Sequence, residues 1–279
     1  MRDKQQRCVQ ALNYALKEIL SSNSKALIIG EDLHDPYGGA FKVTKDLSTD
    51  FSEQVISTPI SESAIFGVAC GLALRGYRPI VEVMFGDFLT LGLDQLINHI
   101  SIFQDVGIKQ KTIPLVVRTP MGGGRGYGPT HSKSLEKLLL GIPNIIVVAT
   151  SRYHDIASML KCAVALDQPV IFIENKQMYA HLNDYPINGW INQFAVRETV
   201  GNFPALTLSP ANFNSAQWTI VTYGGSATIV LEAARQLILD HDVICEVVIL
   251  SSLQPMDISP VVESVERTGR LLALEEGVS

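Results

Sequence analysis

Glu62 is the first residue whose type and position could support chemistry. It follows the apolar run 54–60 and opens an apolar, glycine-containing stretch with helical spacing. An acid in the first turn of a helix ordinarily complements the helix N-terminus, a contribution of about 0.3 to 1 kcal/mol. Among apolar neighbours, the same carboxyl would have a raised pKa through desolvation and could share a proton with a nitrogen base. The residue types alone leave both interpretations open.

Large apolar side chains follow the next apolar run, at Met84, Phe85 and Phe88. They could form a flat platform for an aromatic ring. Aromatic residues at this spacing more often belong to an ordinary core, so this interpretation competes with a structural one. Further along, Asp94 and Asn98 lie four residues apart, a spacing that predicts a hydrogen bond on one helix face.

A glycine-rich segment, RTPMGGGRGYGPTHSKS, spans residues 118–134 and has five glycines within 122–128. Such a density of glycine excludes a helix interior or a strand and permits positive φ angles. Glycine-rich loops can hold phosphates, but neither the P-loop pattern nor the dinucleotide pattern that opens a helix is present. His131 could be a surface histidine or an acid/base group, and its place in a loop favours the second interpretation.

The densest group of acidic side chains, Glu31, Asp32 and Asp35, lies beside His34 after the first apolar run. It could converge on a ligand or be a solvated acidic turn, and the two readings are equally well supported. The four cysteines are far apart, with no CxxC pair and no histidines at ligand spacing. We therefore expect no metal site and no disulfide framework on this chain.

The elements that position these segments are short β-branched runs alternating with helical stretches. Strands are expected over residues 26–30, 54–60, 79–85, 113–118, 144–149 and 169–174, and helices over 4–21, 62–74, 88–105, 134–140 and 154–166. Nearly continuous apolar strands are typical of a mostly parallel sheet with helices on both faces. We predict such an α/β domain over residues 1–190. Ligands gather beyond the carboxyl ends of such strands, where the segments above lie.

A second α/β domain is predicted over residues 205–279. A connection rich in Pro, Asn and Ser spans 182–217 and should contain one or two edge strands. The alternation then resumes, with strands expected over 218–224, 245–250 and 270–276 and helices over 226–239 and 259–268. The last strand would be left uncovered, so we expect this second domain to be incomplete.

Composition excludes several functional classes. The 279 residues are 47% hydrophobic and 18% charged, with a net charge of −6. A net negative chain offers no broad cationic field for nucleic acid. No apolar run approaches the roughly 20 residues of a membrane span, and the N-terminal segment lacks a secretory signal pattern. Free thiols in apolar surroundings suit a reducing compartment, so we expect a cytoplasmic protein that buries apolar surface against partner chains.

Five segments in order, GED…YGGAFKVTKDL, TPISES…G, YRPIVEVMFGDF…DQLINH, PLVVRTPMGG…G…THS and PNIIVVATS…DI, resemble a known family. They are similar to the β subunit of thiamine-diphosphate-dependent 2-oxo acid dehydrogenases, the pyruvate, branched-chain and acetoin enzymes, which are relatives of transketolase. The resemblance implies a transketolase-type pyrimidine-binding domain followed by the start of a transketolase C-terminal domain. It also implies oxidative decarboxylation of a 2-oxo acid with acyl transfer to a lipoyl group.

The resemblance implies roles for four residues. Glu62 matches the glutamate that contacts a ring nitrogen of the thiamine diphosphate aminopyrimidine and activates the cofactor. Phe88 matches the aromatic residue that stacks on that ring, and Met84 matches its neighbour in the same pocket. His131 matches an active-site histidine that donates a proton during the reaction or acyl transfer, although THSK stands here where relatives often have QHSQ.

The resemblance also implies partners and ions. The chain has no GDG motif, the signature of the superfamily segment that holds Mg²⁺ and the diphosphate. The resemblance, together with this missing motif, implies an α subunit on another chain that carries the Mg²⁺ ligands. It also implies an α2β2 heterotetramer with the active site at the αβ interface. The lipoyl domain of the acyltransferase component would be a further partner. Some members hold K⁺ through carbonyls near Leu115, Ala163, Val164 and Leu166, but Leu166 replaces the usual acid, which argues against K⁺ here.

Two alternatives remain open from the sequence. One is a transketolase-like or deoxyxylulose-phosphate-synthase-like enzyme that transfers carbon fragments without a lipoyl acceptor. The other is a non-catalytic assembly subunit, which the joint presence of Glu62, Phe88 and His131 disfavours. The sequence does not identify the 2-oxo acid.

Overall fold

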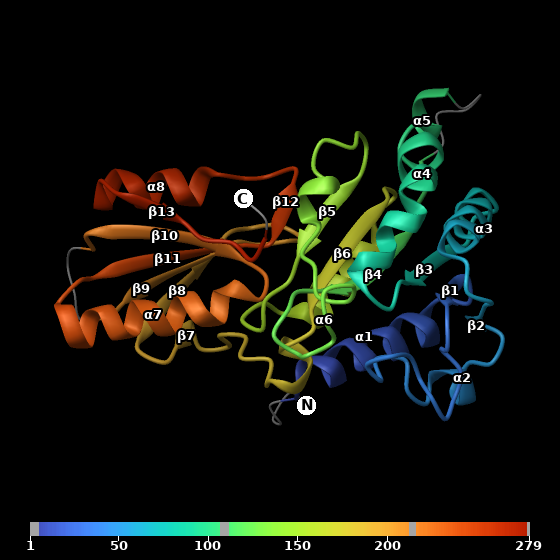
Figure 1. Ribbon diagram of the computed structural model, residues 1–279, viewed down its shortest axis with the longest axis horizontal. Coiled ribbons are helices and arrows are strands. Elements are labelled where there is room, and N and C mark those ends of the chain that lie inside the picture. Colours follow the sequence, from blue (N-terminus) through green and yellow to red (C-terminus); the bar gives the residue numbers. More distant parts are fainter. Residues whose placement is uncertain (1–5, 107–111, 212–215, 278–279) are drawn as a thin grey trace.

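Two α/β units, each built around its own sheet, make up the computed structural model (Figure 1). The structure describes residues 6–106, 112–211 and 216–277. Within these residues the first sheet has the strand order β12-β5-β6-β4-β3-β1-β2, and the second has the order β13-β10-β11-β9-β8-β7. The expected α/β architecture with a mostly parallel first sheet is confirmed. The predicted domain boundaries at residues 190 and 205 stay a prediction.

The first sheet pairs its six main strands in parallel. These strands are β1 (Ala26–Gly30), β2 (Val55–Ser57), β3 (Arg78–Glu82), β4 (Val116–Met121), β5 (Ile146–Ala149) and β6 (Val170–Asn175). Every residue of β1, β4 and β6 is buried, because helices cover both faces of the sheet. A short strand that the sequence did not predict, β12 (Ser252–Gln254), returns from the second unit and pairs antiparallel with β5.

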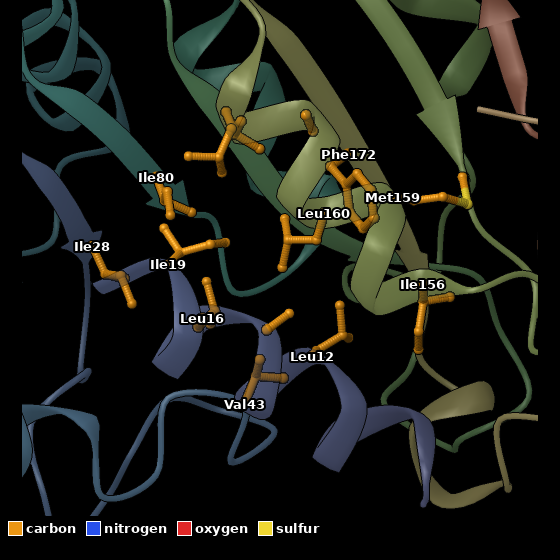
Figure 2. Close-up of a cluster of buried hydrophobic side chains, with 14 of the residues drawn as sticks. Leu12, Leu16, Ile19, Ile28, Val43, Ile80, Ile156, Met159, Leu160 and Phe172 are labelled. Atoms are coloured by element: carbon orange, nitrogen blue, oxygen red, sulfur yellow. The ribbon is translucent and has the colours of Figure 1, made fainter. Parts of the chain in front are cut away.

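One face of this sheet is covered by α1 (Cys8–Ser22) and α6 (Ile156–Ala165). Leu12, Leu16 and Ile19 repeat at helical spacing on α1 and are buried. Burying each such side chain stabilises the fold by roughly 1.5 to 3 kcal/mol. Figure 2 shows them meeting side chains from α6 and the sheet: Ile28, Ile80, Ile156, Met159, Leu160 and Phe172.

The opposite face is covered by α3 (Glu62–Leu74), which has its predicted bounds, and by the segment after β3. The single helix expected over 88–105 is wrong. The chain instead forms η1 (Gly86–Gly92), α4 (Leu93–Gln95), the π-turn η2 (Leu96–Ile100) and α5 (Phe103–Val106). Gly92 packs so tightly that an added Cβ would lie 2.9 Å from the Phe66 ring, which constrains the local winding. The predicted hydrogen bond between Asp94 and Asn98 is present, since Asn98 Nδ2 donates to Asp94 Oδ1 at 2.7 Å.

The helix expected over 134–140 is also wrong, since only the 3-10 turn η3 (Glu136–Leu138) forms there. A segment this short gains too few backbone hydrogen bonds to offset helix nucleation. The glycine-rich residues before it form neither helix nor strand, as predicted. None of the helices formed by the described residues is long and apolar enough to cross a membrane.

The second sheet contains three parallel strands, β10 (Trp218–Tyr223), β11 (Cys245–Leu250) and β13 (Leu271–Ala273). They alternate with α7 (Ser226–His241) and α8 (Ser259–Thr268), as predicted. On β13, Leu271 and Leu272 are 49% and 47% exposed, in line with the expected uncovered strand.

The connection 182–217 is more ordered than expected. Its described residues form β7 (Trp190–Ile191), β8 (Phe194–Glu198) and β9 (Leu206–Pro210), which extend the second sheet by antiparallel pairing. β9 lies between β11 and β8 and is therefore an interior strand. The buried Leu206 and Leu208 explain its position, because their spacing of two places both on one face of the strand.

Candidate active site

The predicted site residues follow strands that are neighbours in the first sheet. Glu62 comes after β2, Met84 and Phe88 come after β3, and the loop that carries His131 begins after β4. Because β2, β1, β3 and β4 are adjacent and parallel, their carboxyl ends lie along one edge of the sheet. This edge is the usual location of ligand sites in α/β folds.

Two carboxyl groups adjoin at the ends of β1 and β2. Glu62 opens α3 and is buried, and Glu31 directly follows β1 and is also buried. Burial raises the pKa of Glu31, the nearby charge of Glu62 raises it further, and a hydrogen bond from the Ser61 backbone N–H lowers it. Glu31 Oε1 has no hydrogen-bond partner among the described residues. The pair is thus suited to accept or share protons with a nitrogen-containing ligand.

Partly exposed apolar side chains adjoin this edge. Met84 and Phe88 are half-buried, and Ile60 is 83% exposed. α3 packs against η1, so the helix that begins with Glu62 and the turn that carries Phe88 are neighbours. A flat ring could be held here by apolar contact, with the carboxyl groups meeting its polar edge.

Phe88 and His131 are brought together by the structure. The His131 ring lies edge-on to Phe88 at a centroid distance of 5.2 Å and edge-on to Phe85 at 4.7 Å. Thr130 Oγ1 is 2.9 Å from His131 Nδ1. Because Nδ1 is engaged by the hydroxyl, Nε2 is the ring nitrogen available for proton exchange with a ligand.

The loop that carries His131 is anchored to the end of the second sheet. Gly123 N–H donates to Glu276 Oε1 at 2.6 Å, and Asn175 Nδ2 donates to Glu276 Oε2 at 3.2 Å. Gly122 has φ +93°, and a Cβ there would clash with the Asn175 amide. Glycine is therefore required at this position for both backbone conformation and space.

Lys176 and Asp87 were missed by the sequence analysis. Lys176 directly follows β6, is fully buried, and has no hydrogen-bond partner for Nζ among the described residues. Its Nζ lies 5.5 Å from the Phe85 ring centroid. Burial lowers the pKa of Lys176, and the charge of Asp87 opposes that shift. Asp87 Oδ1 is likewise buried and unpartnered among the described residues, while Asp87 Oδ2 accepts a hydrogen bond from the Lys133 N–H at 3.4 Å.

A buried ion-pair network fixes the strands beneath the site. Arg118 on β4 donates from Nε and Nη2 to the two carboxylate oxygens of Glu174 on β6, at 2.8 and 2.9 Å. Its Nη1 donates to Glu82 Oε2 on β3 at 2.9 Å, and Tyr179 Oη donates to Glu174 Oε2 at 2.5 Å. The three neighbouring strands are thereby joined through side chains as well as through the sheet. The sequence signal for this ion-pair network is the acidic residue within each of the otherwise apolar runs RPIVE and VIFIEN.

The acidic cluster after β1 does not converge on one point. Burial raises the pKa of Asp35, but hydrogen bonds from Ser48, Asp46 and Thr49 outweigh it and lower the pKa to about 2. His34 Nε2 lies 3.1 Å from the Val55 carbonyl oxygen. Asp35 therefore organises a turn, while Glu31 joins Glu62. Within the described ranges, no group of three or more His, Cys, Asp or Glu residues is arranged to hold a metal ion.

Known families match both parts of the chain. The transketolase pyrimidine-binding domain matches residues 4–181, and the transketolase C-terminal domain matches residues 214–279. The β subunit of the pyruvate dehydrogenase E1 component from Leifsonia xyli is 35% identical over 269 residues, which cover 96% of this chain and 76% of the relative. The β subunit of 3-methyl-2-oxobutanoate dehydrogenase from Mycobacterium tuberculosis is 32% identical, with coverage of 96% and 74%.

Solved structures show the same fold. A split-gene transketolase, described as an inactive β4 tetramer, has a TM-score of 0.68 at 24% identity, covering 96% of this chain and 79% of that chain. Transketolase from Campylobacter jejuni has a TM-score of 0.69 at 18% identity, covering 98% of this chain and 40% of that chain.

Proposed function

The chain belongs to the family of 2-oxo acid dehydrogenase β subunits, and from that premise we propose that it forms one half of a decarboxylating active site. The observation that carries the proposal is the sheet edge where Glu62 adjoins Glu31 and Phe88 adjoins His131. The activity is oxidative decarboxylation of a 2-oxo acid with acyl transfer to a lipoyl group. Both pyruvate and branched-chain enzymes are among the relatives, so the proposal names the substrate class only.

The family implies dependence on thiamine diphosphate, and the residues at the sheet edge fit its aminopyrimidine ring. Glu31 Oε1, which has no hydrogen-bond partner in the described part of the chain, and the buried Glu62 offer a proton-sharing pair for ring and amino nitrogens. Met84 and Phe88 offer apolar surface for the ring. When bound, thiamine diphosphate supplies the electron sink for decarboxylation.

The chain's own residues then bind, orient and move protons. Glu62 holds a proton at its carboxyl for exchange with the ring nitrogen, a type of acid-base help that contributes roughly 10² to 10⁴ in rate. Phe88 and Met84 exclude water from that exchange. His131 Nε2 donates a proton to the developing alkoxide or to the lipoyl sulfur, while Thr130 holds the ring through Nδ1.

β subunits of this family work with an α subunit, and we assign the remaining parts of the site to that partner. This chain has no GDG motif, so the α subunit supplies the Mg²⁺ and diphosphate ligands in an α2β2 assembly. The lipoyl domain of the acyltransferase component approaches the His131 side. We place the complex in the cytoplasm, a location supported by four cysteines that are all free thiols.

A potassium ion is not part of the proposal. The Val164 and Leu166 carbonyls accept hydrogen bonds from Arg78 Nη1 at 3.4 and 2.5 Å. The Leu115 carbonyl accepts from the Val170 N–H at 2.9 Å. Because the Arg78 guanidinium already places a positive charge at the Val164 and Leu166 carbonyls, these carbonyls do not suit a second cation, and we derive no step through K⁺.

The test is a substitution in the co-expressed α/β pair. Glu62→Gln should lower 2-oxo acid turnover at least about 100-fold, because the amide cannot exchange the proton. The circular dichroism spectrum should not change. Glu53→Gln, at an exposed position, is the matched control and should keep full turnover. Equal turnover in wild type and Glu62→Gln would refute the role of Glu62. Product formation without any lipoyl acceptor would instead favour a carbon-fragment transferase.

A further inference from the structure

A pocket of about 490 Å³ lies beside the candidate active site. Its described lining does not include the candidate site residues Glu31, Glu62, Met84, Phe88 and His131. This open pocket is lined by the start of α1, the segment after β1 and the glycine-rich loop. The start of α1 is held near the end of the first unit by the Cys8 N–H, which donates to the His181 carbonyl at 2.9 Å. The volume falls within the roughly 300 to 1,000 Å³ range of small-molecule sites.

Basic side chains gather around this pocket. Its described lining includes Arg7, Lys42, Lys45 and Arg125, opposed by the single acid Asp46. The whole chain carries a net charge of −6, so a local excess of positive charge here is a distinct feature. Such a concentration of cations in a hollow raises the local concentration of anions.

The protein partners of these cations are weak or partial. Lys45 Nζ lies 4.0 Å from Asp46 Oδ2, and both side chains are mostly exposed, a type of pair that contributes little. Lys42 Nζ donates to the Tyr37 carbonyl. Arg125 Nη1 donates to the Lys176 carbonyl at 2.9 Å, and a guanidinium has five N–H donors in all. An anion could therefore be bound without breaking a strong ion pair.

Aromatic rings form one wall of the pocket. Phe41 and Tyr127 meet edge-on at a centroid distance of 6.0 Å, and Phe41 also packs on the buried Tyr179 at 5.2 Å. The Arg125 guanidinium lies 5.9 Å from both the Phe41 and the Tyr127 ring centroids. Ring faces and a planar guanidinium together suit a flat heterocycle.

We propose that this pocket binds a small phosphorylated molecule that carries a flat ring, of the size of a nucleoside monophosphate. The ring lies against Phe41, Tyr127 and Arg125, and the phosphate meets Lys42 and Lys45. The wall is continuous with the active site, because Phe41 contacts Phe85 at 5.4 Å and Phe85 contacts His131 at 4.7 Å. The site is separate from the aminopyrimidine site of the proposed function and does not depend on it.

The test is calorimetric titration of the α/β complex with AMP, adenosine and inorganic diphosphate. AMP should bind, and adenosine should bind at least tenfold more weakly because it lacks the phosphate. Saturation with thiamine diphosphate and Mg²⁺ should leave AMP affinity unchanged. The proposal is overturned if AMP does not bind, if adenosine binds as tightly as AMP, or if thiamine diphosphate displaces AMP. Binding of diphosphate equal to that of AMP would refute the role of the ring wall.

Variants locate the site. Arg125→Gln should weaken AMP binding at least tenfold, and Arg125→Lys should weaken it less, because it keeps the charge but loses the planar group. Lys25→Gln, a lysine away from the pocket, should bind AMP as the wild type does. Circular dichroism checks that each variant folds. Wild-type AMP affinity in Arg125→Gln would contradict the proposal.

Discussion

At the scale of single residues, the distinctive feature of this protein is the number of charged side chains buried at one edge of the first sheet. Glu31, Glu62 and Lys176 lie at strand ends, and Arg118 and Glu174 lie within the strands beneath them. Arg118 and Glu174 are paired with each other and also with Glu82 and Tyr179. Glu31 and Lys176, in contrast, have atoms without partners among the described residues. The first kind of buried charge holds a structure in place, and the second kind is suited to a ligand.

Arg118→Met should strongly destabilise the protein, because it leaves the buried carboxylates of Glu82 and Glu174 without their counter-charge. Removing one member of a buried pair costs about 3 to 5 kcal/mol. Urea denaturation of the purified chain measures the loss of unfolding free energy. Arg235→Met, which removes an exposed pair with Glu232, is the control and should barely shift the urea midpoint. Equal midpoints for the two variants would contradict this account.

Residue-level prediction selected candidates where a side chain type stood out at a strand end, and it missed residues whose role depends on their partners. Glu62, Phe88 and His131 could be selected from motifs, although their roles stay proposals. Lys176 was overlooked because its significance lies in complete burial with no hydrogen-bond partner for Nζ among the residues that the structure describes, which depends on several elements at once. For the same reason, the sequence could not show that Asp35 serves a turn while Glu31 joins Glu62.

At the scale of elements, the short turn η3 carries a buried acid, Glu136. Burial, together with the nearby charges of Glu276 and Glu275, raises the pKa of Glu136 to about 7, although a backbone hydrogen bond and the charge of Lys176 oppose the shift. Glu275 and Glu276 follow β13. Glu276 accepts a hydrogen bond from Gly123 in the loop that carries His131, and Glu275 forms an ion pair with Lys137 on η3. A charge on Glu136 therefore opposes the contact between the two units.

The stability of the wild type should fall as the pH rises from about 4.5 to about 7 through the Glu136 carboxyl. In that window the folded state keeps a proton that the unfolded state has lost, so the free energy of unfolding decreases with pH. Glu136→Gln should remove this part of the pH dependence and be more stable than wild type near pH 8 by about 1 to 3 kcal/mol. Urea titrations near pH 5 and pH 8 measure it. If the unfolding free energy of Glu136→Gln depended on pH as steeply as that of the wild type, the assigned role of Glu136 would be wrong. Glu263→Gln, at an exposed position, is the control.

Elements with a strong local pattern were predicted closely, and those set by tertiary contacts were not. β1, α3 and α8 have the bounds expected from apolar runs and helical spacing. The segment after β3 has good helical spacing, but close packing around Gly92 accompanies a mixture of 3-10, α and π turns. β12 is only three residues long and exists because β5 offers an edge, which no local pattern signals.

At the scale of the whole molecule, the apolar excess of the sequence reappears as exposed apolar surface on the first unit. Val68 on α3 is 53% exposed, Leu91 on η1 is 58% exposed and Ile97 on η2 is 41% exposed. α3 packs against both η1 and η2, so these side chains are carried by neighbouring elements. Large exposed apolar side chains on neighbouring elements are a feature of subunit interfaces.

Val68→Glu should therefore weaken association with the α subunit at least tenfold while the chain itself stays folded. A charge placed on α3 would have to be desolvated in the interface without a partner. Co-purification and size-exclusion chromatography with light scattering measure the assembly, and circular dichroism checks the fold. Val200→Glu, at a fully exposed position of the second unit, should assemble normally. Normal assembly of Val68→Glu would remove this surface from the interface.

The hydrogen bond between Gly123 and Glu276 spans 153 positions of the chain. A ribosome releases the glycine-rich loop long before its acceptor, so the loop cannot reach its anchored conformation until residue 276 has emerged. Nascent chains arrested before that point would carry a largely built first sheet with an unanchored His131. The glycine-rich loop therefore reaches its anchored conformation only after the residues of both units have been synthesised.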